Sequence, residues 1–192
     1  MTKLIAEGAE TFRQHYPSIA IIVTARSKGK DNAMAIGLHS AISFKPPLYG
    51  IAISPRRFTY QLIVDSKEFG INFLPFEAAE LIASVGGSGG QQLDKFQHFN
   101  IAKEIPVKTR VPLLEAAYAA YECRLVYDWD CGDHRWVVGE VVAVHLTKEA
   151  FTPEGALDLN QVNPALFIAS DYYVTTDKDK LKYLDRKAYG HR

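Results

Sequence analysis

One segment alternates between apolar and polar side chains, and this pattern constrains the fold more than any other feature of the sequence. Its apolar members are Tyr121, Cys123, Leu125, Tyr127 and Trp129, and its polar members are Glu122, Arg124, Asp128 and Asp130. A period of two is typical of a β-strand with one buried face. Residues 130–133 form a turn, and residues 136–146 return as an almost wholly apolar strand. The two strands are therefore predicted to pair as a long hairpin.

Shorter elements precede and follow this hairpin. Strands are predicted over residues 19–25, 32–43, 48–54 and 68–74, with a last strand or extended stretch over 164–174. Helices are predicted over 54–65, where Ser54 would cap the helix and Pro55 would take its first position, and over 76–85. Short strands with few helices and no regular β-α-β alternation favour a mainly β fold, an antiparallel barrel with helical insertions. All 192 residues suit a single domain, with a core of about 16–174 and a charged tail over 175–192.

The charge balance and the cysteines narrow the choice of partners and compartment. Lys plus Arg and Asp plus Glu number 22 each, so no nucleic-acid surface or polybasic membrane patch is predicted. No apolar run approaches the roughly 20 residues that span a bilayer, and residues 1–10 lack the pattern of a signal peptide. We therefore expect a cytoplasmic protein whose Cys123 and Cys131 are reduced. Cys131 and His134 lack the further ligands of a zinc site, so no metal is predicted.

Three common catalytic motifs are missing from the sequence. It contains no Walker-type phosphate loop and no Gly-x-Gly-x-x-Gly run that opens a helix after a strand. Residues 86–90 (Gly-Gly-Ser-Gly-Gly) match the nucleophile elbow of serine hydrolases in letters, but they follow a predicted helix rather than a strand. The sequence thus argues against a P-loop enzyme, a Rossmann dehydrogenase and a serine hydrolase.

Three segments remain as candidates for ligand binding. The first is residues 54–60, which place Ser54, Arg57, Thr59 and Tyr60 at the predicted helix start. Free N–H groups and the positive end of the helix dipole suit an anion there. Arg57 and the Thr59 hydroxyl would add hydrogen bonds to phosphate oxygens. The alternative interpretation is an ordinary capped surface helix.

The second candidate is the glycine-rich loop over residues 86–90. Ser88 and Gly89 lie within it, and Lys95 follows shortly after. Four glycines in five residues do not support regular structure, so the loop either flexes or lets its backbone approach a ligand closely. A lysine after such a loop would close over the same phosphate. A plain solvent loop is the alternative.

The third candidate is Asn32 followed by Ala33, Met34 and Ala35. An apolar slot with one well-placed polar group suits a flat heteroaromatic ring. The alternative is a turn asparagine beside an ordinary core strand. His134 lies just past the tight turn of the long hairpin, where its side chain would point at the mouth of a barrel. It could equally be a solvated hairpin residue.

Together these segments resemble the flavin reductase-like, FMN-binding split-barrel family, which includes flavoredoxins. The resemblance extends from about residue 16 to residue 173 and depends on the order of several motifs. These are Tyr16-Pro17, Asn32 with small residues, Ser43-Phe44-Lys45-Pro46-Pro47, Arg57-Phe58-Thr59-Tyr60, Phe69-Gly70-Ile71-Asn72, a Ser-Gly stretch and Asp94-Lys95-Phe96. The resemblance implies a six-stranded Greek-key barrel that pairs as a homodimer, with FMN near the interface.

The resemblance also implies roles for particular residues. Asn32 matches the asparagine that contacts the flavin ring. Thr59 and Lys95 match the residues that contact the phosphate, with Arg57 two positions before Thr59. A histidine after the late hairpin turn corresponds to His134. An aromatic residue near the C-terminal strand corresponds to Phe167.

One position departs from the family pattern. Several members carry an aromatic residue, often Trp, six positions after the asparagine, and this chain has Leu38 there. Loss of such a stacking partner costs about 0.5–1.5 kcal/mol beyond the area buried. The departure predicts weaker flavin binding or an altered reduction potential.

The function that the resemblance implies is an NAD(P)H-dependent flavin oxidoreductase. Hydride would pass from nicotinamide to FMN, with FAD as a possible substitute, and the flavin would supply the redox chemistry. His134 would act as the catalytic residue at the ring edge or near the nicotinamide. One alternative is a flavoredoxin-like carrier with tightly bound FMN and a redox protein as partner. Another is a split-barrel binding module that has lost its redox use.

Overall fold

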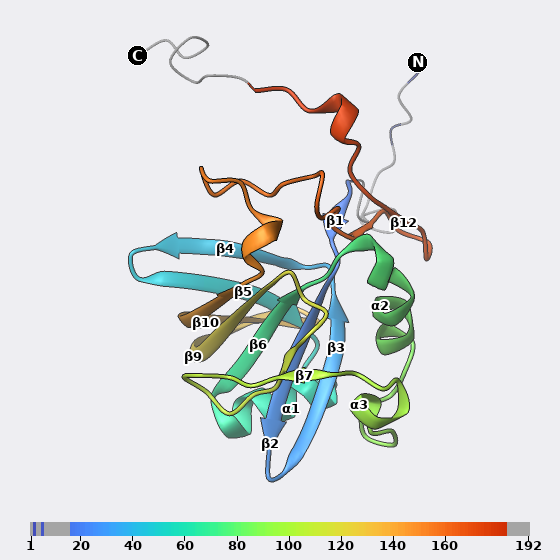
Figure 1. The fold of residues 1–192 in the computed structure, drawn as a ribbon. Helices are drawn as coiled ribbons and strands as arrows, with labels where there is room; N and C mark the ends of the chain where they lie inside the picture. Colours follow the sequence, from blue (N-terminus) through green and yellow to red (C-terminus); the bar gives the residue numbers. More distant parts are fainter. Residues whose placement is uncertain (1, 3–4, 6–15, 184–192) are drawn as a thin grey trace.

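The computed structural model describes residues 2, 5 and 16–183, and its main element is a seven-stranded antiparallel sheet (Figure 1). The strands follow the order β3-β2-β6-β9-β10-β5-β4. Their bounds are β2 Ile21–Ser27, β3 Lys30–Ile36, β4 His39–Phe44, β5 Pro47–Ile53, β6 Glu68–Phe73, β9 Ala119–Cys131 and β10 His134–Leu146. The mainly β class predicted from the sequence is confirmed.

The strand predicted over residues 32–43 is in fact two strands. β3 ends at Ile36 and β4 begins at His39, with a break at Gly37 and Leu38. β3 pairs with β2 at one edge of the sheet, whereas β4 pairs with β5 at the other edge. The chain must leave one edge to reach the other, so a single straight strand is impossible here. This break accounts for the seventh strand beyond the six that were expected.

The long hairpin forms as predicted, but the burial of its first strand differs from the prediction. Val138 pairs with Tyr127 and Gly139 pairs with Leu125, so Val126 is an extra, bulged residue. Beyond this bulge Tyr127 and Trp129 are exposed, at 47% and 52%. The prediction that these aromatic residues face the core is therefore wrong for the outer half of the strand. The assignment of Glu122 to a solvated face is also wrong, because Glu122 is fully buried.

The α-helices pack against β2 and β3 and position the candidate site (Figure 1). α1 runs over Phe58–Ser66 and α2 over Ala79–Gly86, and the short α3 over Lys95–His98. The first helix begins four residues later than the predicted Ser54, because Arg57 still has an extended backbone with ψ 136°. Ser54 contributes only its carbonyl, which accepts the Arg57 N–H at 3.0 Å in a turn. Ser54 as a cap and Pro55 as the first helical residue are therefore wrong.

Apolar side chains pack on both faces of the sheet. Along β2, Ile21 and Val23 join the core inside the curved sheet, while Ile22 joins a second core on its outer face. α2 and α3 cover this outer core with Ile82, Val85 and Phe96 among other residues. The two faces of β2 thus pack into two cores at once, which explains why its first three residues, 21–23, are all apolar.

The remaining elements are short. β1 Ser18–Ile19, β11 Leu166–Phe167 and β12 Tyr173–Val174 form a small sheet, and β7 Lys103–Glu104 pairs with β8 Leu113–Leu114. Short 3-10 helices lie at Phe76–Ala78, Lys148–Ala150 and Lys178–Lys180. The stretch predicted over 164–174 is interrupted by left-handed residues 169–171, which turn β12 back onto β11. The predicted charged tail is described only as far as residue 183, and most of residues 1–10 lies outside the description.

None of the helices in the described residues is both long and apolar enough to cross a membrane.

Candidate flavin site

A cavity of about 200 Å³ lies where β3, the start of α1 and the glycine-rich loop meet. It brings together most of the candidates from all three predicted segments, which are far apart in the sequence. The predicted residues that line it are Asn32, Met34, Ala35, Arg57, Thr59, Ser88, Gly89 and Lys95. The fold therefore brings residues 32–35, the start of α1 and the glycine-rich loop together in one site.

Asn32 is the most informative residue of this cavity. Its side chain is 2% exposed, and its Nδ2 donates a 2.8 Å hydrogen bond to Thr59 Oγ1. Its Oδ1 is buried and has no hydrogen-bond partner among the described residues. A buried acceptor left without a donor costs about 1–3 kcal/mol. The amide is thus fixed in orientation by Thr59, with its free oxygen available to a ligand donor.

Gly90 packs directly against this amide. A Cβ built at Gly90 would lie within 2.3 Å of Asn32 Oδ1 and 2.6 Å of Asn32 Cγ. Any larger residue would push the asparagine out of place, so the loop approaches β3 as closely as only glycine permits. The glycine-rich sequence suggested a close backbone approach to a ligand, and the approach seen here is to the Asn32 side chain.

Lys95 is buried beneath the cavity rather than extended into solvent. Its Nζ donates to Ala33 O at 2.9 Å and to Val85 O at 2.7 Å, and the residue is 3% exposed. Burial, followed by the nearby charge of Arg57, lowers the pKa of Lys95 to about 8. A lysine ammonium has three donors, so one remains for an anion in the cavity. A bound anion would also favour the charged form.

Five predicted residues do not line this cavity. Ser54 precedes α1, and Ala33 packs in the outer core. Tyr60 points away, with its hydroxyl donating to Asp128 Oδ2 at 2.8 Å. The late helix start accounts for the placement of Ser54. His134 and Phe167 are the other two.

Phe167 lines a neighbouring cavity of about 180 Å³ that shares Ala35 with the first. Leu38, which stands where the resembled family often has an aromatic residue, also lines this second cavity. The two adjoining cavities together reach the size range of small-molecule sites. Phe167 therefore lies beside the continuation of the candidate site, as an aromatic neighbour of a ring would.

His134 lies at the tip of the long hairpin. Its Nδ1 is 2.8 Å from Asp133 Oδ1, and its side chain is 35% exposed. The hydrogen bond to His134 lowers the pKa of Asp133, and the charge of Arg56 lowers it further. His134 lines neither the first nor the second cavity.

Sequence reasoning missed several lining residues: Arg56, Phe58, Val85, Gly86, Gly90, Gln91 and Gln92. Gly86 and Gly90 belong to the loop that was singled out, so the loop signal covered them. Arg56 and Phe58 lie within the motif 54–60. Nothing in the local sequence marks Val85, Gln91 or Gln92, because their position depends on how the loop folds back onto β3.

A family model described as the flavin reductase-like domain matches residues 12–176. The chain belongs to this family. Its fold is accordingly the split β-barrel, as predicted.

Curated relatives and solved structures agree with this assignment. An uncharacterised protein of Aeropyrum pernix is 32% identical over 68% of the chain, a match that spans only 50% of that relative. A ferric-chelate reductase (NAD(P)H) of Archaeoglobus fulgidus is 27% identical over 67% of this chain and 76% of its own.

Among solved structures, an FMN-binding protein from Thermus thermophilus, with bound 1-cyclohex-2-enone, has a TM-score of 0.85 and 29% identity, covering 95% of this chain and 100% of that one. The flavoredoxin of Desulfovibrio vulgaris has a TM-score of 0.83 and 21% identity over 97% and 100% of the two chains, and it supports the fold alone.

Proposed function

We propose that the protein binds FMN in this cavity and transfers hydride from NAD(P)H to it. The observation that carries the proposal is the orphaned Oδ1 of Asn32. A buried acceptor with a fixed orientation beside an apolar strand fits a planar ring that carries an N–H donor. The family and the reductase names among its members support flavin chemistry. FMN rather than FAD, and NAD(P)H as donor, belong to the proposal.

The residues of the cavity divide by the part of the cofactor that they would hold. Asn32 would accept a hydrogen bond from the ring, and Met34 and Ala35 would lie against it. Arg57, Thr59 and the third donor of Lys95 would bind the phosphate, with loop residues Ser88 and Gly89 beside them. Ser54, Tyr60 and Ala33, which lie off the cavity, would support these residues from behind.

Bound FMN would supply the hydride chemistry itself. The chain would orient the ring through Asn32 and exclude water with the loop over residues 86–92. His134 would stand at the mouth with Asp133 holding its Nδ1. Its Nε2 makes no hydrogen bond within residues 16–183, so it remains available to a substrate. This arrangement is consistent with His134 as the catalytic residue that the resemblance implies.

We also propose that two copies pair. The outer half of the hairpin exposes the stacked rings of Tyr127 and Trp129, whose centroids lie 4.9 Å apart, and Phe44 on β4 is 90% exposed. Exposed aromatic clusters of this kind mark interaction surfaces. A homodimer would cover them and would bring a second chain to the cavity. Sedimentation as a clean monomer at micromolar concentration would contradict this part of the proposal.

A cytoplasmic location completes the proposal. Both Cys123 and Cys131 are free thiols, which suits a reducing compartment.

The decisive experiment is anaerobic mixing of the purified protein with NADH and then with NADPH. The protein should be yellow, release FMN on denaturation and bleach with at least one donor. Bound FMN that stays oxidised with both donors would replace the reductase by an electron carrier with a redox protein partner. A colourless protein that takes up no added FMN would overturn flavin binding altogether.

A further inference from the structure

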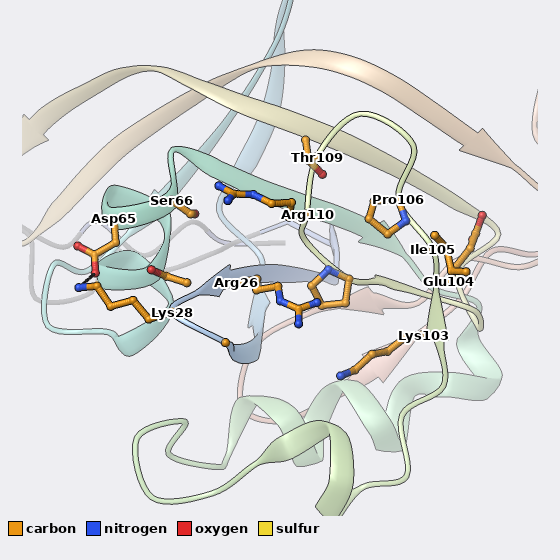
Figure 2. A pocket seen from close by; sticks show the side chains of 13 residues that line it. Arg26, Lys28, Asp65, Ser66, Lys103, Glu104, Ile105, Pro106, Thr109 and Arg110 are labelled. Carbon is orange, nitrogen blue, oxygen red and sulfur yellow. Dashed lines mark hydrogen bonds and ion pairs between the residues drawn. The ribbon is translucent and has the colours of Figure 1, made fainter.

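A second and larger cavity, of about 820 Å³, lies apart from the candidate flavin site. It is enclosed by the β2–β3 turn, the C-terminal end of α1 and the segment over residues 103–112, which we call the roof segment (Figure 2). None of its lining residues lines the flavin cavity. Neither the family resemblance nor the proposed redox chemistry gives this cavity a role.

The roof segment is fixed in place, so the cavity is preformed rather than a crease between loose loops. The fully buried carboxylate of Glu122 accepts the backbone N–H groups of residues 107, 108 and 109 at 2.7, 2.9 and 2.6 Å. It also accepts the Thr109 hydroxyl at 2.8 Å. Glu68 accepts the next N–H, that of Arg110, at 3.0 Å. Two carboxylates thus hold four consecutive backbone groups of the roof.

Two arginines present unused donors to this cavity. Arg26 comes from β2 beneath the roof segment, and Arg110 comes from the roof segment itself (Figure 2). Each uses only its Nε for an ion pair, with Asp31 at 3.4 Å and with Glu68 at 3.5 Å. The terminal nitrogens of both guanidinium groups have no partner within residues 16–183. A guanidinium whose Nε is held by a carboxylate keeps a planar pair of donors that matches an oxyanion.

Asp31 forms ion pairs with two cations of the cavity lining, Arg26 and Lys103. Asp31 is only 11% exposed, and its Oδ2 takes a 2.7 Å ion pair from Lys103. Its Oδ1 is a buried acceptor with no hydrogen bond in the described part of the chain, and Arg26 is its nearest ion-pair partner. The side chains of Arg26 and Arg110 are 48% and 78% exposed, and such long, exposed ion pairs contribute little to folding. Stability alone therefore does not account for two arginines facing one preformed cavity.

Apart from the two arginines, most of the lining residues are polar or charged: Ser27, Lys28, Asp65, Ser66, Lys103, Glu104 and Thr109. The apolar part of the lining lies on the roof segment. Ile105, Pro106 and Pro112 contribute to it, and Ile105 is 82% exposed although it is a large aliphatic residue. The volume of this cavity lies within the size range of small-molecule sites, and it offers an apolar surface beside charged groups. We propose that it is a second ligand site, which takes a small organic anion with an apolar body and a carboxylate or phosphate group. The oxyanion would bind Arg26 and Arg110, and the body would lie against Ile105, Pro106 and Pro112.

Calorimetric titration of the FMN-loaded protein tests this proposal, with 2-naphthoate as the probe. 2-Naphthamide keeps the rings without the charge, and inorganic phosphate keeps an oxyanion without the rings. The expected result is saturable, one-site binding of naphthoate, with both comparison probes at least tenfold weaker. Arg26→Gln and Arg110→Gln should each weaken naphthoate about tenfold, which corresponds to about 1.4 kcal/mol.

Lys148→Gln serves as the matched control, because it removes one positive charge from an exposed residue outside the cavity. It should leave naphthoate binding unchanged. Arg26→Lys, which keeps the charge but loses the planar donor pair, should fall between Arg26→Gln and the parent. All variants should retain FMN, which separates this test from that of the flavin site. No binding of naphthoate to the parent, equal binding of the amide, or equal losses in Lys148→Gln would overturn the proposal.

Discussion

Replacing Asn32 by leucine isolates the property on which the flavin assignment depends. Leucine has nearly the same size as asparagine but removes both polar atoms. In the FMN-free protein the change loses the hydrogen bond to Thr59 Oγ1, worth about 0.5–1.5 kcal/mol. It also removes the orphaned Oδ1, whose burial costs about 1–3 kcal/mol. The two terms oppose one another, so the change in the free energy of unfolding should lie between a loss of about 0.5 kcal/mol and a gain of about 2.5 kcal/mol.

Asn72 offers a matched control within the same sheet. It is fully buried, and its amide is satisfied on both sides. Its Nδ2 donates to Ile22 O at 2.9 Å, and its Oδ1 accepts the Leu114 N–H at 2.8 Å. Asn72→Leu leaves two buried backbone groups without partners, so it should destabilise the protein by about 2–5 kcal/mol.

FMN binding should show the reverse order of effects. Without the Asn32 acceptor, a ring donor would be buried unsatisfied, at a cost of about 1–3 kcal/mol. That cost corresponds to a loss of affinity of roughly 5- to 150-fold. In Asn72→Leu the affinity per folded molecule should stay within about threefold of the parent, a difference below 1 kcal/mol.

Both variants should be measured without FMN by urea unfolding and then by FMN titration, since a bound ligand itself raises stability. The reasoning is refuted if Asn32→Leu is as destabilising as Asn72→Leu while FMN affinity is unchanged. That result would make Asn32 an ordinary core asparagine.

Three further perturbations test the site and the roof segment. Gly90→Ala should weaken FMN binding at least several-fold, because the added Cβ would displace the Asn32 amide. Gly89→Ala should bind FMN almost normally, because its Cβ meets only the flexible end of a glutamine at 3.1 Å. Equal losses of FMN affinity in the two variants would contradict the close approach of Gly90 to Asn32. Lys95→Ala should weaken FMN roughly tenfold more than riboflavin, since a hydrogen bond to a charged group is worth about 1.5–3 kcal/mol, and a uniform loss for both flavins would remove Lys95 from the phosphate site. Burial opposes the charged form of His145, but its hydrogen bonds to Glu122 and Glu104 outweigh burial and raise the pKa of His145. Protonated His145 therefore stabilises the folded protein fully below pH 6.5, and this stabilisation is lost as the pH rises through the raised pKa. Burial alone would raise the pKa of Glu122, yet its hydrogen bonds lower it to about 2. Ionised Glu122 therefore stabilises the folded protein above pH 4.5, and this stabilisation is lost as the pH falls towards 2. A free energy of unfolding that does not change with pH across the His145 and Glu122 ranges, or that is unaltered in His145→Gln, would contradict this arrangement.

Much of the β architecture could be read from local patterns. The alternation over residues 121–130 predicted a strand and the turn at 130–133 a hairpin, and both are present. The glycine-rich loop and the Asn32 strand were also found as separate signals. These features are visible because hydrophobic period and turn chemistry are properties of neighbouring residues.

The sequence alone determined which residue types could meet a flavin, but only the tertiary structure decided how they meet. The Asn32 amide is oriented by a threonine 27 residues away, and Lys95 is buried by two carbonyls from β3 and α2. Likewise the bulge at Val126 reverses the exposed face of β9. No local pattern encodes these outcomes, because the face that a side chain presents depends on strand register and on the partner across the sheet. Local chemistry sets the candidates, and long-range pairing sets the distance between them.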